Sequence, residues 1–137
     1  MPMILRAVIA IAMLFGAAAY GQEAGIAKPN LVLKQAVEGL PKHDKPEVFV
    51  ITATFQPGEK TPLHTHRFPV TVYVLEGAFT LELEGHPPMV VKAGEALVEP
   101  PNVKMIGYNR SATDVTKVVV FYVADPGTPF LDLVKHH

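Results

Sequence analysis

The chain has 137 residues, a length that suits one domain with a core of its own. Hydrophobic residues make up 49% of it and charged residues 18%, and the formal net charge is −1, so no basic surface for nucleic acid is expected. The chain has no cysteine, which excludes disulfides, thiol chemistry and a lipid anchor on cysteine.

The first 21 residues are predicted to be a secretory signal peptide. Arg6 precedes an apolar and small run from Ala7 to Tyr20, and small residues up to Gly21 suit a cleavage site. This run of 14 residues is shorter than the roughly 20 that span a bilayer, which disfavours a membrane anchor. We therefore expect a periplasmic or secreted protein without membrane association after cleavage. Its 11 basic and 13 acidic residues would give a net charge of −2.

The rest of the chain predicts strands separated by turns, with no helical period after residue 40. The predicted strands cover residues 29–37, 47–55, 70–76, 78–84, 89–92, 96–99, 103–109 and 115–123. Short strands with frequent turns indicate an all-β sandwich or barrel, and a double-sheet jelly roll fits the pattern. We expect one barrel domain over residues 22–125 and a C-terminal tail over residues 126–137.

Two histidines, His64 and His66, stand one residue apart after a turn at Pro57-Gly58 and a further proline, Pro62. Side chains of residues i and i+2 project from the same face of a strand, so both imidazoles are expected side by side. Neighbouring imidazoles are suitable ligands for a transition metal. The pair is therefore the first candidate for a metal site.

From about residue 30 to residue 125 the chain resembles the cupins, whose two motifs it follows in order and spacing. The first motif matches at Gly58, His64, His66 and Gly77, and the second matches at Gly94, Pro100 and Asn109. The resemblance implies a double-stranded β-helix, or jelly-roll, barrel. It also implies a metal inside the barrel and, often, a homodimer. The segment from Lys28 to Val37 is then the part expected to cross to a partner.

Three positions depart from the cupin motifs: Val70 replaces the metal-binding Glu, Met105 the third His, and Asn102 a Gly. Met105 is one candidate for a replacement ligand, and its thioether would favour copper; the alternative is that it fills the core. Glu99 is the second candidate, and its carboxylate would favour iron, manganese or zinc; the alternative is a carboxylate at the rim.

Three function classes follow. The protein is a metal-dependent enzyme acting on a small molecule in the barrel, a metal-binding protein without turnover, or a metal-free binding or structural barrel. Ligation through His64 and His66, with Met105 or Glu99, belongs to the first two classes. The transition metal would be copper, zinc, iron or manganese. No nucleic-acid partner is expected.

Overall fold

In the computed structural model of the protein, residue 16 and residues 24–135 are described, so the signal peptide predicted for residues 1–21 lies outside them except for residue 16. This part of the chain consists of β-strands and connecting segments. No helix within it is long and apolar enough to cross a membrane. The all-β prediction is confirmed for these residues.

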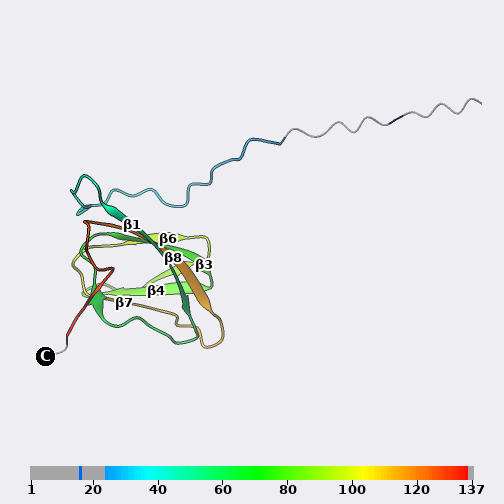
Figure 1. Cartoon of the computed structure of the whole chain (residues 1–137). Helices are drawn as coiled ribbons and strands as arrows, with labels where there is room; N and C mark the ends of the chain where they lie inside the picture. Colours follow the sequence, from blue (N-terminus) through cyan, green and yellow to red (C-terminus); the bar gives the residue numbers. More distant parts are fainter. Residues whose placement is uncertain (1–15, 17–23, 136–137) are drawn as a thin grey trace, which may run out of the picture.

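Two antiparallel sheets pack face to face to form the barrel (Figure 1). One sheet has the strand order β1-β8-β3-β6 and the other has the order β5-β4-β7-β2-β9. The strands are β1 (Glu47–Phe55), β2 (His64–Thr65), β3 (Val70–Glu76), β4 (Ala78–Leu83), β5 (Met89–Lys92), β6 (Ala96–Glu99), β7 (Met105–Tyr108), β8 (Thr116–Ala124) and β9 (Asp132–Leu133). The chain passes repeatedly from one sheet to the other, which is the jelly-roll arrangement.

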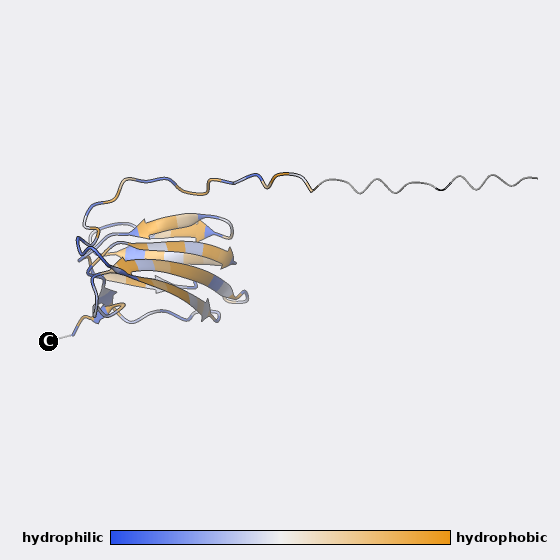
Figure 2. Ribbon diagram, turned by 45° about the horizontal axis from the view of Figure 1, so that its top comes forward, coloured by the Kyte–Doolittle hydropathy of each residue, from blue (hydrophilic) through white to orange (hydrophobic). Residues whose placement is uncertain are grey.

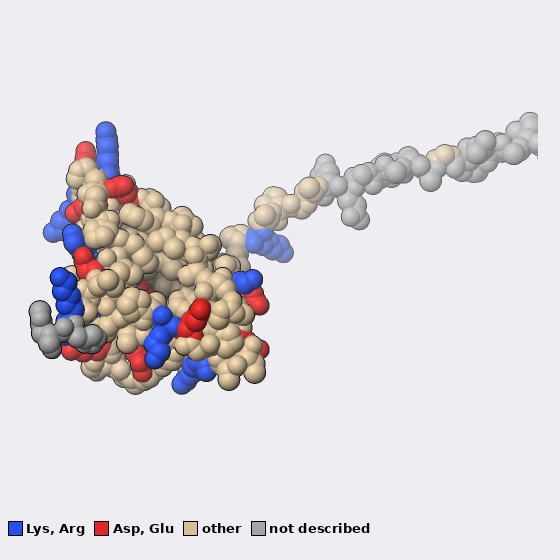
Figure 3. Space-filling view, turned by 60° about the horizontal axis from the view of Figure 1, so that its bottom comes forward, with Lys and Arg blue, Asp and Glu red and all other residues tan. Residues whose placement is uncertain are grey.

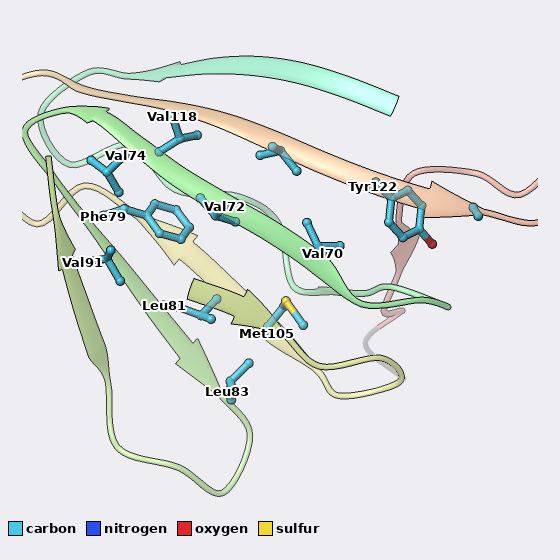
Figure 4. Close-up of a cluster of buried hydrophobic side chains, with 12 residues drawn as sticks. Val70, Val72, Val74, Phe79, Leu81, Leu83, Val91, Met105, Val118 and Tyr122 are labelled. Carbon is cyan, nitrogen blue, oxygen red and sulfur yellow. The ribbon is translucent and has the colours of Figure 1, made fainter. Parts of the chain in front are cut away.

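Alternation of side chains builds the interior. Along β8, buried residues alternate with half-buried or exposed ones over the full length of the strand, because every second side chain faces the opposite sheet. Figure 2 shows hydrophobic colour along most strands of both sheets. Twelve apolar residues form the core between the sheets (Figure 4). They are Val70, Val72, Val74, Phe79, Leu81, Leu83, Val91, Met105, Val118, Val120, Tyr122 and Ala124.

The turn between β3 and β4 requires glycine at Gly77. Its φ is 73°, in the left-handed region, and a Cβ atom there would overlap the carbonyl oxygen of Val115. Asn102, which stands where the cupin motif has glycine, also has a positive φ of 60°. Asparagine tolerates this conformation better than most residues, so the substitution preserves the turn.

The strand predictions are confirmed from residue 47 onward, with ends shifted by at most two residues. Two earlier predictions are wrong in the structure. Residues 29–37 form no strand, and this segment is extended with exposed side chains such as Leu31. The predicted C-terminal tail contains β9, which pairs with β2 in the five-stranded sheet. Both errors concern pairing between distant segments, which local alternation does not encode.

Candidate metal centre

His64 and His66 lie inside the barrel at the end of the five-stranded sheet. His64 belongs to β2, where it lies opposite Met105 on one side and Leu133 on the other. Only 4% of His64 and 1% of His66 is exposed. The imidazole rings are 4.8 Å apart between centroids and nearly perpendicular, at 79°. The sequence predicts that the two imidazoles lie side by side, and in the structure they are adjacent and buried.

Backbone carbonyls determine which nitrogen of each ring carries the proton. His64 Nδ1 donates to the carbonyl oxygen of Pro62 at 2.7 Å, and His66 Nδ1 donates to that of Phe130 at 2.6 Å. A carbonyl accepts only, so both Nδ1 atoms must be protonated. In the neutral form, each Nε2 then presents a lone pair.

These two lone pairs face each other. The Nε2 atoms of His64 and His66 are 3.2 Å apart, and the second of them is also 3.2 Å from a carboxylate oxygen of Glu99. Three acceptors in contact in an apolar interior repel one another unless a positive charge lies among them. A proton on one imidazole or a bound cation would supply that charge.

The position of Glu99 follows from strand register. Val70 on β3 lies directly opposite Glu99 on β6, and side chains of directly paired residues share one face of a sheet. The carboxylate of Glu99 therefore enters the barrel beside Val70, at the position where the cupin motif has its own glutamate. Its side chain is only 7% exposed. The interpretation of Glu99 as a carboxylate at the rim is wrong.

The donor set suits a divalent transition metal. Ligands about 2.1 Å from one ion at angles near 90–110° are separated by roughly 3.0–3.4 Å, and both contacts of 3.2 Å fall in this interval. Glu99 does not contact His64, so the three groups form a row rather than a triangle. In agreement, no group of three or more His, Cys, Asp or Glu side chains across residues 24–135 is placed to hold a metal ion as it stands. The Glu99 side chain would have to move toward His64 to complete a site.

Met105 lies in a different environment. It is 1% exposed and packs in the apolar core, where Figure 4 shows it near Val70, Leu81 and Leu83. It shares a face with His64 across the β2–β7 pairing, but it does not line the cavity in front of the histidines. Its surroundings favour the core-filling interpretation over metal ligation.

A cavity of about 90 Å³ lies against the histidines and Glu99. Its remaining lining is apolar apart from Thr61, and it includes no Lys or Arg. The lining residues are Ile51, Ala53, Phe55, Thr61, His64, His66, Val72, Phe79, Glu99, Gly107, Val118, Val120, Phe130 and Leu131. Among the described residues, Lys, Arg, Asp and Glu side chains other than Glu99 are not buried, and both signs are interspersed over the face drawn in Figure 3. The cavity thus pairs one polar cluster with apolar walls.

Two aromatic rings enclose His66. The ring centroids of Phe130 and Tyr122 are 4.9 Å and 5.7 Å from that of His66. Burial raises the pKa of the Tyr122 hydroxyl, whose oxygen accepts a hydrogen bond from the Phe68 amide at 3.3 Å. The Tyr122 side chain therefore stays uncharged, and its ring packs as an apolar surface against His66. The role of Phe130 was not predicted from the sequence, because its carbonyl reaches His66 across 64 residues.

Comparison with known proteins agrees with this architecture. A family model described as the cupin domain matches residues 51–122. A comparison with curated proteins finds no match. Among solved structures, an RmlC-like cupin family protein from Methanocaldococcus jannaschii, with a double-stranded β-helix fold, is similar at a TM-score of 0.53 and 23% identity, covering 69% of this chain and 94% of that one.

Two further solved structures are similar in fold. A cupin-like protein from Thermotoga maritima aligns at a TM-score of 0.53 and 24% identity, with 64% of each chain covered. The DMSP lyase DddQ from Ruegeria pomeroyi aligns at a TM-score of 0.55 and 20% identity, covering 63% of this chain. The chain spans only 42% of the length of that lyase.

The stability of the metal-free protein is expected to fall in mild acid because of His64. Burial, the largest effect, lowers the pKa of this imidazole below its ordinary value of 6.5. The unfolded chain then takes up the proton at a higher pH than the folded chain. Stability is therefore retained above 6.5 and lost as the pH falls from there to the lowered pKa.

Urea unfolding with a chelator, at about pH 8 and about pH 5, measures this loss. The variant His64→Gln should lose less stability between the two pH values than the wild type. His43→Gln, at an exposed position, is the matched control and should behave as wild type. An equal loss in all three proteins would contradict the prediction.

Proposed function

Because the chain belongs to the cupin family, we propose that it binds a divalent transition metal inside the barrel through His64, His66 and Glu99. The observation that carries the proposal is the 3.2 Å contact between two Nε2 atoms whose rings are both held by carbonyls at Nδ1. That arrangement directs two lone pairs and a buried carboxylate to one place. A cation there removes the repulsion among them.

Two imidazole nitrogens and one carboxylate favour Fe²⁺, Mn²⁺ or Zn²⁺. Copper, which Met105 would favour, is the weaker expectation because that thioether packs in the core. Glu99 can approach His64 by rotating its side chain, which would close the row of donors into a set of three. The carbonyls of Pro62 and Phe130 keep the imidazoles oriented before the metal arrives, and this preorganisation reduces the entropy lost on binding.

The ligand of the cavity is proposed to be a small, uncharged molecule. Besides His64, His66 and Glu99, the cavity wall has one polar side chain, that of Thr61. It has no cationic side chain to bind an anion. The apolar walls would exclude water and hold a hydrocarbon portion of the molecule against the metal. When bound, such a metal supplies Lewis acidity to an oxygen of the ligand. If the protein turns this molecule over, we propose that it does so as a lyase, isomerase or oxygenase.

A second candidate function is a metal-free barrel that binds a small molecule. Supporting it, no group of three or more metal-binding side chains among the described residues is placed to hold an ion as it stands. A hydrogen shared between the two facing Nε2 atoms would relieve the same repulsion without a metal. The metal-binding barrel and the metal-free barrel differ in the metal content expected of the purified protein, so measuring bound metal distinguishes them.

The metal proposal predicts which substitutions remove metal. Purified wild type, His64→Ala, Glu99→Gln and Met105→Leu are exposed in turn to Fe²⁺, Mn²⁺, Zn²⁺ and Cu⁺, and bound metal is measured by elemental analysis and calorimetry. His64→Ala should abolish binding, and Glu99→Gln should weaken it by at least the roughly 10-fold to 100-fold that loss of an orienting partner costs, because a direct charged ligand is removed.

Met105→Leu is the matched control, since it conserves volume and should leave the affinity for zinc, iron and manganese unchanged. Preference for copper with loss on Met105→Leu would assign the third ligand to Met105 instead. Absence of metal from every protein would support the metal-free barrel.

Export to the periplasm or the extracellular medium is also proposed, on the apolar run after Arg6. Expression of the full chain in a bacterium, followed by N-terminal sequencing of the soluble product, tests it. A new N-terminus near residue 22 is expected, whereas a soluble cytosolic protein that begins at Met1 would contradict export.

We further propose a homodimer that involves the segment before β1. This segment carries exposed apolar side chains, with Ile26 94% and Leu31 75% exposed, and within the described part of the chain it has no sheet partner (Figure 1). On the edge strand β1, Val48 is 69% and Val50 63% exposed. Unpaired backbone beside exposed apolar side chains favours pairing with a second copy.

Deleting residues 22–37 from the mature protein should convert a dimer into a monomer, because the crossing segment is lost. Light scattering measures the mass, and circular dichroism verifies that the barrel remains folded. Val50→Lys is the companion variant, directed at the sheet face rather than the segment. A dimeric deletion variant would contradict exchange of this segment.

A further inference from the structure

The segment after β8 returns to the candidate site and attaches to it through backbone and side-chain contacts. Its strand β9 pairs with β2, with Leu133 opposite His64 and Asp132 opposite Thr65. The amide of Val134 donates to the carbonyl of Leu63 at 3.1 Å. Residues 128–134, which we name the C-terminal strap, therefore lie along the strand that carries the first histidine.

The middle of the strap contacts the second histidine. The carbonyl of Phe130 accepts the Nδ1 hydrogen of His66 at 2.6 Å, and this is the contact that directs the Nε2 lone pair inward. The Phe130 ring packs against both His66 and Tyr122, at centroid distances of 4.9 Å and 5.5 Å. Phe130 and Leu131 also form part of the cavity wall.

A paired hydrogen bond holds the strap in place. Arg67, the residue next to His66, donates from Nε and a terminal nitrogen to the two oxygens of Asp132 at 2.9 Å and 3.0 Å. This two-point geometry fixes the angle between the partners as well as their distance. The guanidinium holds the pKa of the Asp132 carboxyl below its ordinary value, so the pair is charged at neutral pH.

We propose that the C-terminal strap is the positioning element of the candidate metal centre: the Phe130 carbonyl sets the tautomer of His66, and the Arg67–Asp132 pair keeps that carbonyl in reach. The inference rests on the proposed function for its effect on metal affinity. Its effect on the tautomer of His66 does not depend on metal. Arg67 and Asp132 are positioning residues, because they act on His66 only through the backbone between Phe130 and Asp132.

The physical reason is that a free imidazole exchanges its proton between two nitrogens. When the strap detaches, Nδ1 of His66 loses its acceptor, and the tautomer with hydrogen on Nε2 becomes accessible. That tautomer presents a donor instead of a lone pair and cannot bind metal through Nε2. Each weakening of the strap should therefore lower metal affinity in proportion to the time it spends detached.

Zinc affinity is measured by calorimetry in the full-length mature protein and its variants Arg67→Gln and Asp132→Asn. Each single change should weaken binding by up to about threefold to fivefold, the limit that one exposed ion pair allows. The exchanged pair, Arg67→Asp with Asp132→Arg, should recover most of the affinity. Glu84→Gln is the matched control, because its ion pair with Lys104 at 3.6 Å is similarly exposed and does not contact the strap; it should change nothing.

Nitrogen-15 NMR of the histidines in the metal-free protein near pH 8 gives the second readout. Wild-type His66 should carry its hydrogen on Nδ1, and a variant that ends at Thr128 should show it shared with Nε2. That variant should bind zinc about 10-fold to 100-fold more weakly, as expected for loss of a group that orients a ligand. If the shortened protein fails to fold, the same NMR and zinc-binding measurements are made on Asp132→Asn.

Unchanged zinc affinity in the strap variants, with His66 still protonated on Nδ1, would overturn the proposal. If the wild type binds no metal, the proposed function fails separately. The NMR comparison then still decides whether the strap sets the tautomer.

Discussion

Two imidazole nitrogens with lone pairs repel each other at 3.2 Å in an apolar interior unless a positive charge lies between them. The rest of the site is organised by this constraint. The carbonyls of Pro62 and Phe130 prevent either ring from avoiding the conflict by moving its proton to Nε2. Glu99 adds a buried carboxylate that is itself unstable without a nearby cation. The barrel thus brings three electron-rich groups together at one place in its interior.

Much of the fold was predictable because alternation and turns are local properties. The strands from residue 47 onward follow the period-two pattern, and Gly77 marks a turn that only glycine allows. The segment over residues 29–37 has β-forming residues but no strand partner among residues 24–135, so propensity alone overestimated it. β9 has two residues and no alternation to detect, and its pairing with β2 arises only when the chain closes on itself.

The site was predictable only in part for a similar reason. Spacing was enough to place His64 and His66 together, since they are two residues apart. The direction of Glu99 depends on its pairing with Val70, and the following Pro100-Pro101 turn hides that register in the sequence. Met105 presents the opposite difficulty: it occupies the motif position of a ligand, yet its side chain packs in the core. The Phe130 carbonyl carries no side-chain signature at all, so no residue pattern could identify it.

The pairing of Val70 with Glu99 also bears on how the ligands of cupin sites can change during evolution. Two residues directly opposite on neighbouring strands point to the same side of the sheet, so a carboxylate can be lost from one strand and regained from the other while its position in the interior is preserved. A linear motif counts such an exchange as the loss of a ligand. The appropriate unit of comparison is the cross-strand pair, and barrels classed as degenerate on one strand merit inspection of the facing residue on the next.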